Sequence, residues 1–213
     1  MSYFEIRGGA PLFGRLQVQG AKNSVLPILA AAFLAPGQSV IHNCPDLSDV
    51  AATGKILRLL GCRVEREGGT LLVDASQPTG SSIPDPLMRE MRSSVIFLGA
   101  MLARLGRAEL SYPGGCELGP RPIDLHLSAL RSLGAEIVEE QGHLRCTDGG
   151  GLVGREICLS LPSVGATENA MLAACGAQGV TTIVGAAQEP EIADLQEFLN
   201  AMGALVSGAG SPV

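Results

Sequence analysis

The chain has 213 residues, of which 46% are hydrophobic, 17% charged and 3% aromatic, and its net charge is −6. A chain of this length and apolar content can bury a sizeable core, and its many small aliphatic residues favour an α/β fold. The acidic balance, with two lysines and no basic run, argues against a nucleic-acid-binding protein, which would carry a basic patch.

Membrane and metal sites are also absent from the sequence pattern. The longest apolar stretch, residues 25–36, is too short to span a bilayer, and residues 1–20 contain no signal-peptide core. The cysteines form no CxxC pair and no zinc-type spacing with histidine. They are Cys44, Cys62, Cys116, Cys146, Cys158 and Cys175. We expect a cytoplasmic protein with free thiols and without a metal or membrane partner.

In chain order, the first elements form a unit that is then repeated. A small-residue helix ends at Gly37, a strand is expected at residues 39–41, and a second helix ends at Gly61. A strand around Val64 follows, and a turn at residues 68–69 leads into another. Each glycine is expected to terminate its helix.

Two further units repeat this order. Their helix-ending glycines are Gly106, Gly134, Gly179 and Gly203. The corresponding strands are expected at residues 108–110 and 181–184, and around Ile137 and Val206. Three such units would bury their alanine-rich helices together and turn their sheets outward. The sequence therefore predicts an α/β fold with pseudo-threefold symmetry.

One loop breaks this regularity. From first to second glycine the units span 24, 28 and 24 residues, and the extra length of the middle unit falls within residues 112–122. An insertion in one copy of a repeat maps to a loop, and loops on a rigid scaffold often carry binding residues. The repeat pattern alone thus singles out the loop around Cys116.

Cys116 follows two glycines and precedes Arg121 by five residues. Glycine lets the backbone bend sharply and a ligand approach closely, and a helix is expected to begin near Asp124. A thiol between a cation and a helix N-terminus has a lowered pKa and is reactive. Alternatively, Cys116 is an ordinary buried residue, as cysteine often is. We expect the other cysteines to be structural.

The first helix of each unit begins with residues suited to anions or hydroxyl groups. They are Lys22 and Asn23 in the first unit, Arg92 in the second, and residues 163–167 in the third. The alternatives are a solvated lysine and simple helix caps. His126, in the first turn of the helix near Asp124, is a candidate ligand contact or acid–base group, or a merely solvated side chain.

Together these residues resemble the UDP-N-acetylglucosamine 1-carboxyvinyltransferase family over the whole chain. The matching segments are Gly20-Ala21-Lys22-Asn23, Met91-Arg92-Ser93-Ser94, Pro113-Gly114-Gly115-Cys116, Arg121-Pro122-Ile123-Asp124-Leu125-His126, Ser163-Val164-Gly165-Ala166-Thr167 and Glu189-Pro190-Glu191-Ile192. The resemblance implies transfer of enolpyruvate from phosphoenolpyruvate to the sugar 3-hydroxyl, the first committed step of peptidoglycan synthesis, with release of phosphate and no cofactor. It also implies an inside-out α/β barrel of three βαβαββ-like repeats.

The resemblance assigns roles to individual positions. Cys116 is the implied general acid that protonates the enol carbon, and it can also form a thioether with the substrate. Lys22 and Asn23 hold phosphoenolpyruvate, while Arg92 and Arg121 contact anionic groups of the two substrates. The other implied substrate contacts are Pro122, Ile123, Asp124, Leu125, His126, Ser163, Val164 and Gly165.

This chain departs from the family pattern in two respects. Many members carry lysine where this chain has Pro162, which removes one diphosphate contact. Members also have a second domain that supplies an aspartate to deprotonate the sugar hydroxyl. The resemblance makes residues 1–21 a strand segment that packs with that domain, and residues 22–213 the three-repeat domain. We expect the chain to be about half of the enzyme and inactive alone.

Two other interpretations remain open. The chain could be a stand-alone module that binds a sugar nucleotide without catalysis. It could also resemble enolpyruvylshikimate-phosphate synthase, which shares the fold, although the Gly-Gly-Cys loop argues against this assignment.

Overall fold

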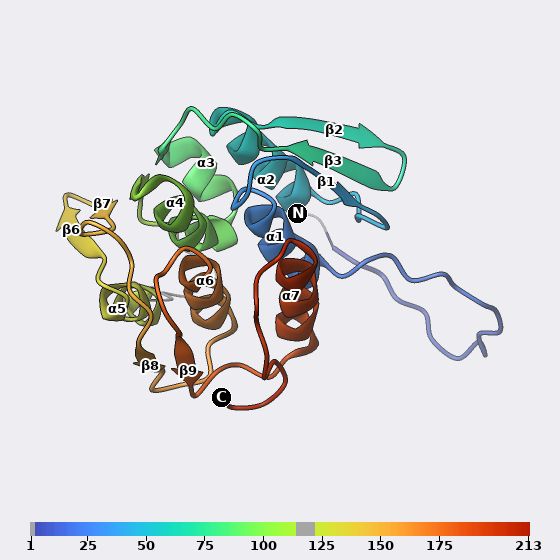
Figure 1. Ribbon diagram of the computed structural model, residues 1–213. Coiled ribbons are helices and arrows are strands. Elements are labelled where there is room, and N and C mark those ends of the chain that lie inside the picture. The colour runs from blue at the N-terminus through green and yellow to red at the C-terminus, as the bar shows by residue number, and fades with distance from the viewer. Residues whose placement is uncertain (1–2, 114–121) are drawn as a thin grey trace.

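The computed structural model describes residues 3–113 and 122–213, so Cys116 and Arg121 lie outside the described residues. In this part of the chain, helices occupy the centre and three small sheets lie around them (Figure 1). The three predicted units follow one another along the chain, each with its own sheet.

The first unit has the predicted order of elements. Helix α1 (Lys22–Ala31) leads into strand β1 (Gln38–Ile41), helix α2 (Ser48–Leu59) and the hairpin of β2 (Arg63–Glu67) and β3 (Thr70–Asp74). The strands form an antiparallel sheet in the order β1-β3-β2. The return strand β3 therefore pairs with the strand that precedes α2, which closes the unit on itself.

The second unit begins with short elements that the sequence pattern did not reveal. Strand β4 (Ser82–Ile83) is followed by helix α3 (Asp85–Glu90), the 3-10 helix η1 (Arg92–Ile96) and helix α4 (Phe97–Leu105). Helix α4 ends at Gly106, whose φ of 68° is the left-handed conformation that glycine adopts readily. Arg92 thus opens a helix as expected, and its first turn is 3-10.

The rest of this unit matches the first. Strand β5 (Arg107–Ser111) and helix α5 (Asp124–Ser132) flank the inserted loop, and β6 (Glu136–Glu140) and β7 (His143–Thr147) form the closing hairpin. The sheet order is β4-β5-β7-β6, with β4 parallel to β5 and the remaining pairs antiparallel. Helix α5 begins at Asp124, as predicted.

The third unit is shorter at its end. Strand β8 (Glu156–Cys158) lies parallel to β9 (Thr182–Val184), with helix α6 (Val164–Ala174) between them and helix α7 (Pro190–Ala201) after β9. The prediction of a strand around Val206 is wrong: residues 204–213 carry no strand. They turn back instead, and the Pro212 carbonyl accepts hydrogen bonds from the backbone N–H groups of Gly185 and Ala186.

The core lies between the first helices of the three units, as predicted. Leu29 on α1, Phe97 on α4 and Leu172 on α6 are fully buried. The helices α4 and α6 approach so closely at Gly99 that a Cβ there would lie 2.3 Å from the carbonyl oxygen of Asn169. The sheets cover the outside of this bundle, but in the described residues they remain three separate sheets and do not form a closed barrel.

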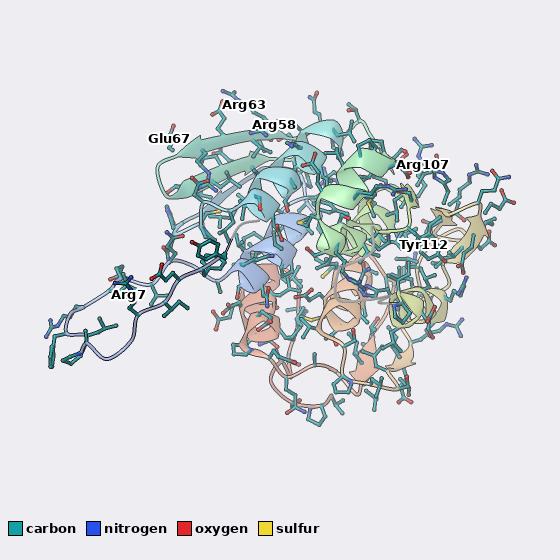
Figure 2. All side chains as sticks on the ribbon, turned by 180° about the vertical axis from the view of Figure 1, so that it is seen from behind. Arg7, Arg58, Arg63, Glu67, Arg107 and Tyr112 are labelled. Carbon is teal, nitrogen blue, oxygen red and sulfur yellow. The ribbon has the colours of Figure 1, made fainter. Side chains whose placement is uncertain are left out.

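The N-terminal segment stands apart from this core. Residues 3–20 contain no helix or strand and form an extended arm that reaches away from α1 (Figure 1), and Arg7 marks the same arm in Figure 2. The arm exposes seven large apolar side chains. They are Tyr3, Phe4, Ile6, Leu12, Phe13, Leu16 and Val18. The packing of residues 1–21 on a second domain stays a prediction.

Candidate functional site

A cavity of about 500 Å³ opens where the first helices of all three units begin. The N-terminal residues of α1, η1 and α6 line it, together with the first turn of α5. The first turns of α1 and α6 direct backbone N–H groups that have no partner within their own helix toward the N-terminal end. The fold therefore gathers at one place the helix starts that are far apart in the sequence.

Most of the predicted site residues lie in this cavity. They are Lys22, Asn23, Arg92, Pro122, His126, Ser163, Val164 and Gly165. Three others do not line it: Ile123 is buried in the core, Leu125 packs against the core, and Asp124 is exposed at the start of α5. Pro122, the first described residue after the inserted loop, borders the cavity, so this end of the loop reaches the site.

Lys22 is an ion-paired side chain in this structure. Its Nζ lies 2.5 Å from Oδ2 of Asp49 on α2, and the lysine side chain remains half exposed. Asp49 also lines the cavity. An anion entering the cavity would meet the positive charges of Lys22 and Arg92, which both line it.

Acidic side chains of α7 hold the start of α1. The Asn23 amide donates to Oε1 of Glu191 at 3.4 Å, and the Ser24 hydroxyl donates to Asp194 at 2.5 Å. These contacts join the first and third units across the chain. Glu191 belongs to the segment Glu189-Pro190-Glu191-Ile192, one of those that carry the family resemblance.

Ser163 caps helix α6 at the cavity. Its hydroxyl oxygen accepts a hydrogen bond from the backbone N–H of Ala166 at 3.4 Å. Ser163 is therefore a helix cap, as one of the two interpretations of the sequence expected, and it also lines the cavity. The two roles are compatible because a hydroxyl oxygen has two lone pairs and a proton of its own.

His126 is held in its uncharged form. Burial, reinforced by the nearby Arg92 guanidinium, lowers the pKa of His126 to about 4. At neutral pH the ring is therefore a neutral imidazole that offers one N–H donor and one acceptor nitrogen. This state suits a hydrogen-bonding contact better than proton donation from an imidazolium.

Glu168 is a site residue that sequence reasoning missed. Its side chain on α6 lines the cavity and is 6% exposed. Burial, with the nearby Glu191 and Glu189 carboxylates, raises the pKa of Glu168 to about 8, so the group is mostly protonated at pH 7. The signal in the sequence was Thr167-Glu168-Asn169, three polar residues in a row inside an otherwise small and apolar helix.

The five described cysteines divide into three buried and two exposed thiols. Cys44, Cys62 and Cys146 are buried, and burial raises the pKa of each thiol, to about 11 for Cys62 and Cys146. These residues fit the predicted structural role. Cys158 on β8 and Cys175 at the C-terminal end of α6 are exposed, in contrast.

Residues 3–113 and 122–213 bring together no three His, Cys, Asp or Glu side chains that could hold a metal ion. None of their helices has the length and apolar character needed to cross a membrane. A second cavity, of about 470 Å³, lies among α6, β9, α7 and residues 204–213. Its lining is largely apolar and contains none of the predicted site residues.

The geometry suits an anionic ligand with several oxygen atoms. Two cations, the N-termini of two helices and the neutral donors His126 and Ser163 surround one cavity. Phosphate and carboxylate groups bind at helix N-termini and beside Lys and Arg side chains. A neutral Glu168 can add a donor, whereas an ionised one would repel such a ligand.

Known proteins with similar sequences are carboxyvinyltransferases. The family model of EPSP synthase (3-phosphoshikimate 1-carboxyvinyltransferase) matches residues 6–213. The chain is 56% identical over 211 residues to UDP-N-acetylglucosamine 1-carboxyvinyltransferase 2 of Caldanaerobacter subterraneus subsp. tengcongensis, which covers 99% of this chain and 50% of that protein. It is 52% identical over 215 residues to UDP-N-acetylglucosamine 1-carboxyvinyltransferase 1 of Symbiobacterium thermophilum, with 99% and 49% covered. The chain thus spans about half the length of these relatives.

Solved structures share the fold. The enolpyruvyl transferase NikO from Streptomyces tendae superimposes with a TM-score of 0.81 at 27% identity, over 94% of this chain and 47% of that one. An EPSP synthase from Acinetobacter baumannii gives a TM-score of 0.70 at 23% identity, over 93% and 45% of the two chains, which is a likeness in fold alone.

Proposed function

Because the chain belongs to the EPSP synthase (3-phosphoshikimate 1-carboxyvinyltransferase) family and is a homologue of UDP-N-acetylglucosamine 1-carboxyvinyltransferases, we propose that it forms about half of such an enzyme. The reaction is transfer of enolpyruvate from phosphoenolpyruvate to the 3-hydroxyl of UDP-N-acetylglucosamine in the cytoplasm, for peptidoglycan synthesis. The observation that carries this proposal is the meeting of Lys22, Arg92 and His126 in one cavity, which Pro122 at the end of the inserted loop also borders.

The chemistry requires a proton donor and an anion site. A proton adds to C3 of phosphoenolpyruvate while the sugar 3-hydroxyl oxygen bonds to C2 and loses its own proton. Departure of phosphate from C2 and of a proton from C3 then restores the carbon–carbon double bond. In this proposal Cys116 is the general acid that protonates C3.

The charged groups of the cavity act on the phosphate and carboxylate. Lys22 and Arg92 face the anionic substrate, and their charges stabilise the negative charge that moves onto the phosphate as it departs. Asn23 contributes a neutral donor, and Ser163 and the start of α6 contact the diphosphate of the sugar nucleotide. Arg121 adds a further cation in this proposal.

We also propose that a second domain completes the site and the fold. It would cover the apolar side chains of the arm, residues 3–20, and supply the base for the sugar hydroxyl. The three units would then form the inside-out barrel with pseudo-threefold symmetry. The exposed apolar arm supports this proposal, because such side chains are stabilised by burial against another surface.

Calorimetric titration with phosphoenolpyruvate tests the anion site. We expect Lys22→Ala to weaken binding about tenfold, the loss typical of one charge-assisted hydrogen bond. Lys55→Ala is the matched control, because Lys55 pairs with Glu90 away from the cavity. Equal losses in the two variants would contradict the assignment.

Titration with UDP-N-acetylglucosamine separates the enzyme from its main alternative. A stand-alone sugar-nucleotide-binding module should bind this ligand tightly by itself. Half of an enzyme whose site closes between two domains should bind it weakly.

A further inference from the structure

Asn169 is a fully buried polar residue in the middle of α6. It lies one residue after the cavity-lining Glu168, and its side chain points away from the third unit and into the second. There the amide forms hydrogen bonds with one atom each of η1, α4 and α5. A buried amide with so many partners restricts whatever it touches, because each of its polar atoms must be satisfied.

Two backbone groups fix the orientation of this amide. The backbone N–H of Gly99 donates to Oδ1 of Asn169 at 2.6 Å, and Nδ2 of Asn169 donates to the carbonyl oxygen of Val95 at 3.0 Å. Exchanging the oxygen and nitrogen would place a donor against the N–H and an acceptor against the carbonyl. The backbone therefore allows only one orientation.

The remaining amide proton determines the tautomer of His126. Nδ2 of Asn169 lies 3.1 Å from Nδ1 of His126. Since Nδ2 can only donate, Nδ1 must be the acceptor, and a neutral imidazole then carries its proton on Nε2. The chain of constraints runs from the Gly99 and Val95 backbone, through the amide, to the ring.

The other edge of the ring faces the cavity. A Cβ at Gly165 would lie 2.9 Å from Cε1 and 3.3 Å from Nε2 of His126, and both residues line the cavity. In the described part of the chain, no hydrogen bond engages Nε2. Glycine at position 165 therefore leaves the Nε2 edge open to a ligand.

We propose that Asn169 is a positioning residue that holds His126 as the neutral Nε2–H tautomer, so that the ring presents a single N–H donor to an oxygen of the ligand. The inference deepens the proposed function and rests on it for the identity of that ligand. The oxygen is one of the phosphoryl or sugar oxygens of UDP-N-acetylglucosamine. Asn169 itself does not line the cavity.

The charged groups around the ring support this assignment. Arg92 of η1 lies close enough to oppose a charge on the ring, and Lys22 of α1 adds a second positive charge to the cavity. Among the described residues, Glu168 of α6 and Asp49 of α2 are the carboxyl groups in the cavity lining, and Lys22 pairs with Asp49. Nearby cations favour the neutral form of the ring. A neutral histidine then donates from Nε2 only if its proton is held on that nitrogen.

Long-range ¹H–¹⁵N correlation spectra of the histidine rings test the proposal on the chain without ligand. The chain has three histidines, and His126→Gln identifies the signals of His126 by their loss. We expect the neutral Nε2–H pattern throughout pH 6–8. A neutral Nδ1–H ring, an imidazolium at pH 7 or a mixture of tautomers would overturn the proposal.

The variant Asn169→Asp tests the cause. It keeps the acceptor for Gly99 but replaces the donor by an oxygen, so that the His126 ring should take a proton at Nδ1. Asn200→Asp is the matched control, because Asn200 is an exposed residue of α7 whose amide makes its hydrogen bonds with the backbone of Val206. An unchanged His126 tautomer in folded Asn169→Asp would overturn the inference, and if this variant does not fold, the spectrum of the unmodified chain decides.

Added UDP-N-acetylglucosamine separates this inference from the proposed function. We expect the Nε2 signal of His126 to shift on binding and the affinity to fall about tenfold in Asn169→Asp. Binding that leaves this signal unmoved would refute the donor role and leave the proposed function standing. Absence of even the weak binding expected of half an enzyme would contradict the proposed function, and the ligand-free spectrum would still decide the tautomer.

Discussion

Glu168→Gln replaces a buried carboxyl by an amide of nearly the same shape and removes its titration. In the folded chain the pKa of Glu168 is about 8, against 4.5 for an ordinary glutamate, because burial and two nearby carboxylates disfavour the charged form. The folded state therefore binds a proton that the unfolded state has released. Between these two pKa values, the free energy of unfolding of the wild-type chain must fall as pH rises.

The size of the effect follows from the same shift. Each pH unit within this window costs about 1.4 kcal/mol, so the wild-type chain should lose about 4 kcal/mol relative to Glu168→Gln between pH 5 and pH 8. Below the unfolded pKa the contribution of Glu168 is fully present, and above the folded pKa the loss is complete. An effect of this size is a large fraction of the total stability of a typical domain.

Urea denaturation at pH 5, 6, 7 and 8 measures this difference, with Glu197→Gln as the control. Glu197 lies on α7 and is exposed, so its replacement should leave the pH dependence of wild-type stability unchanged. Parallel stability curves for Glu168→Gln and wild type would refute the reasoning, because they would mean that Glu168 has the same pKa in the folded and unfolded chain.

Two further predictions concern packing and charge. Gly99→Ala should destabilise the chain by more than 1 kcal/mol in urea denaturation, although alanine is the better helix former, because its Cβ would lie 2.3 Å from the Asn169 carbonyl oxygen. Gly14→Ala, where a Cβ meets nothing within 4 Å, should be neutral, and equal effects would contradict the packing argument. Pro162→Lys should tighten UDP-N-acetylglucosamine binding up to about tenfold in calorimetry by adding a cation beside Ser163; weaker or unchanged binding would contradict this reading of position 162.

Local signals in the sequence predicted the parts of the fold that depend on local chemistry. The start of α5 at Asp124 and the end of α4 at Gly106 follow from capping and backbone preferences, and both are confirmed. The strand expected around Val206 is wrong because a strand needs a paired neighbour, and residues 204–213 turn back onto Gly185 and Ala186 instead. Helix α3 was missed because it has only six residues and therefore shows no helical repeat of apolar positions.

The sequence likewise predicts one part of the candidate site and not another. The helix starts at Lys22, Arg92 and Ser163 could be found because the three units align in sequence, and the structure brings them to one cavity. Glu168 and Asn169 could not be assigned, because nothing in the sequence tells which face of α6 meets the cavity and which meets Val95 and Gly99. Their roles depend on the crossing of α4 and α6 and are visible only in three dimensions.

Phosphate release tests the central claim most directly. The chain, joined to the half of the Caldanaerobacter relative that it does not match, should release phosphate from phosphoenolpyruvate and UDP-N-acetylglucosamine, and the chain alone should not. Cys116→Ala should abolish release, while Cys158→Ala, at an exposed position on β8, should leave it unchanged. Release that survives Cys116→Ala, or that requires shikimate 3-phosphate in place of the sugar nucleotide, would contradict the account.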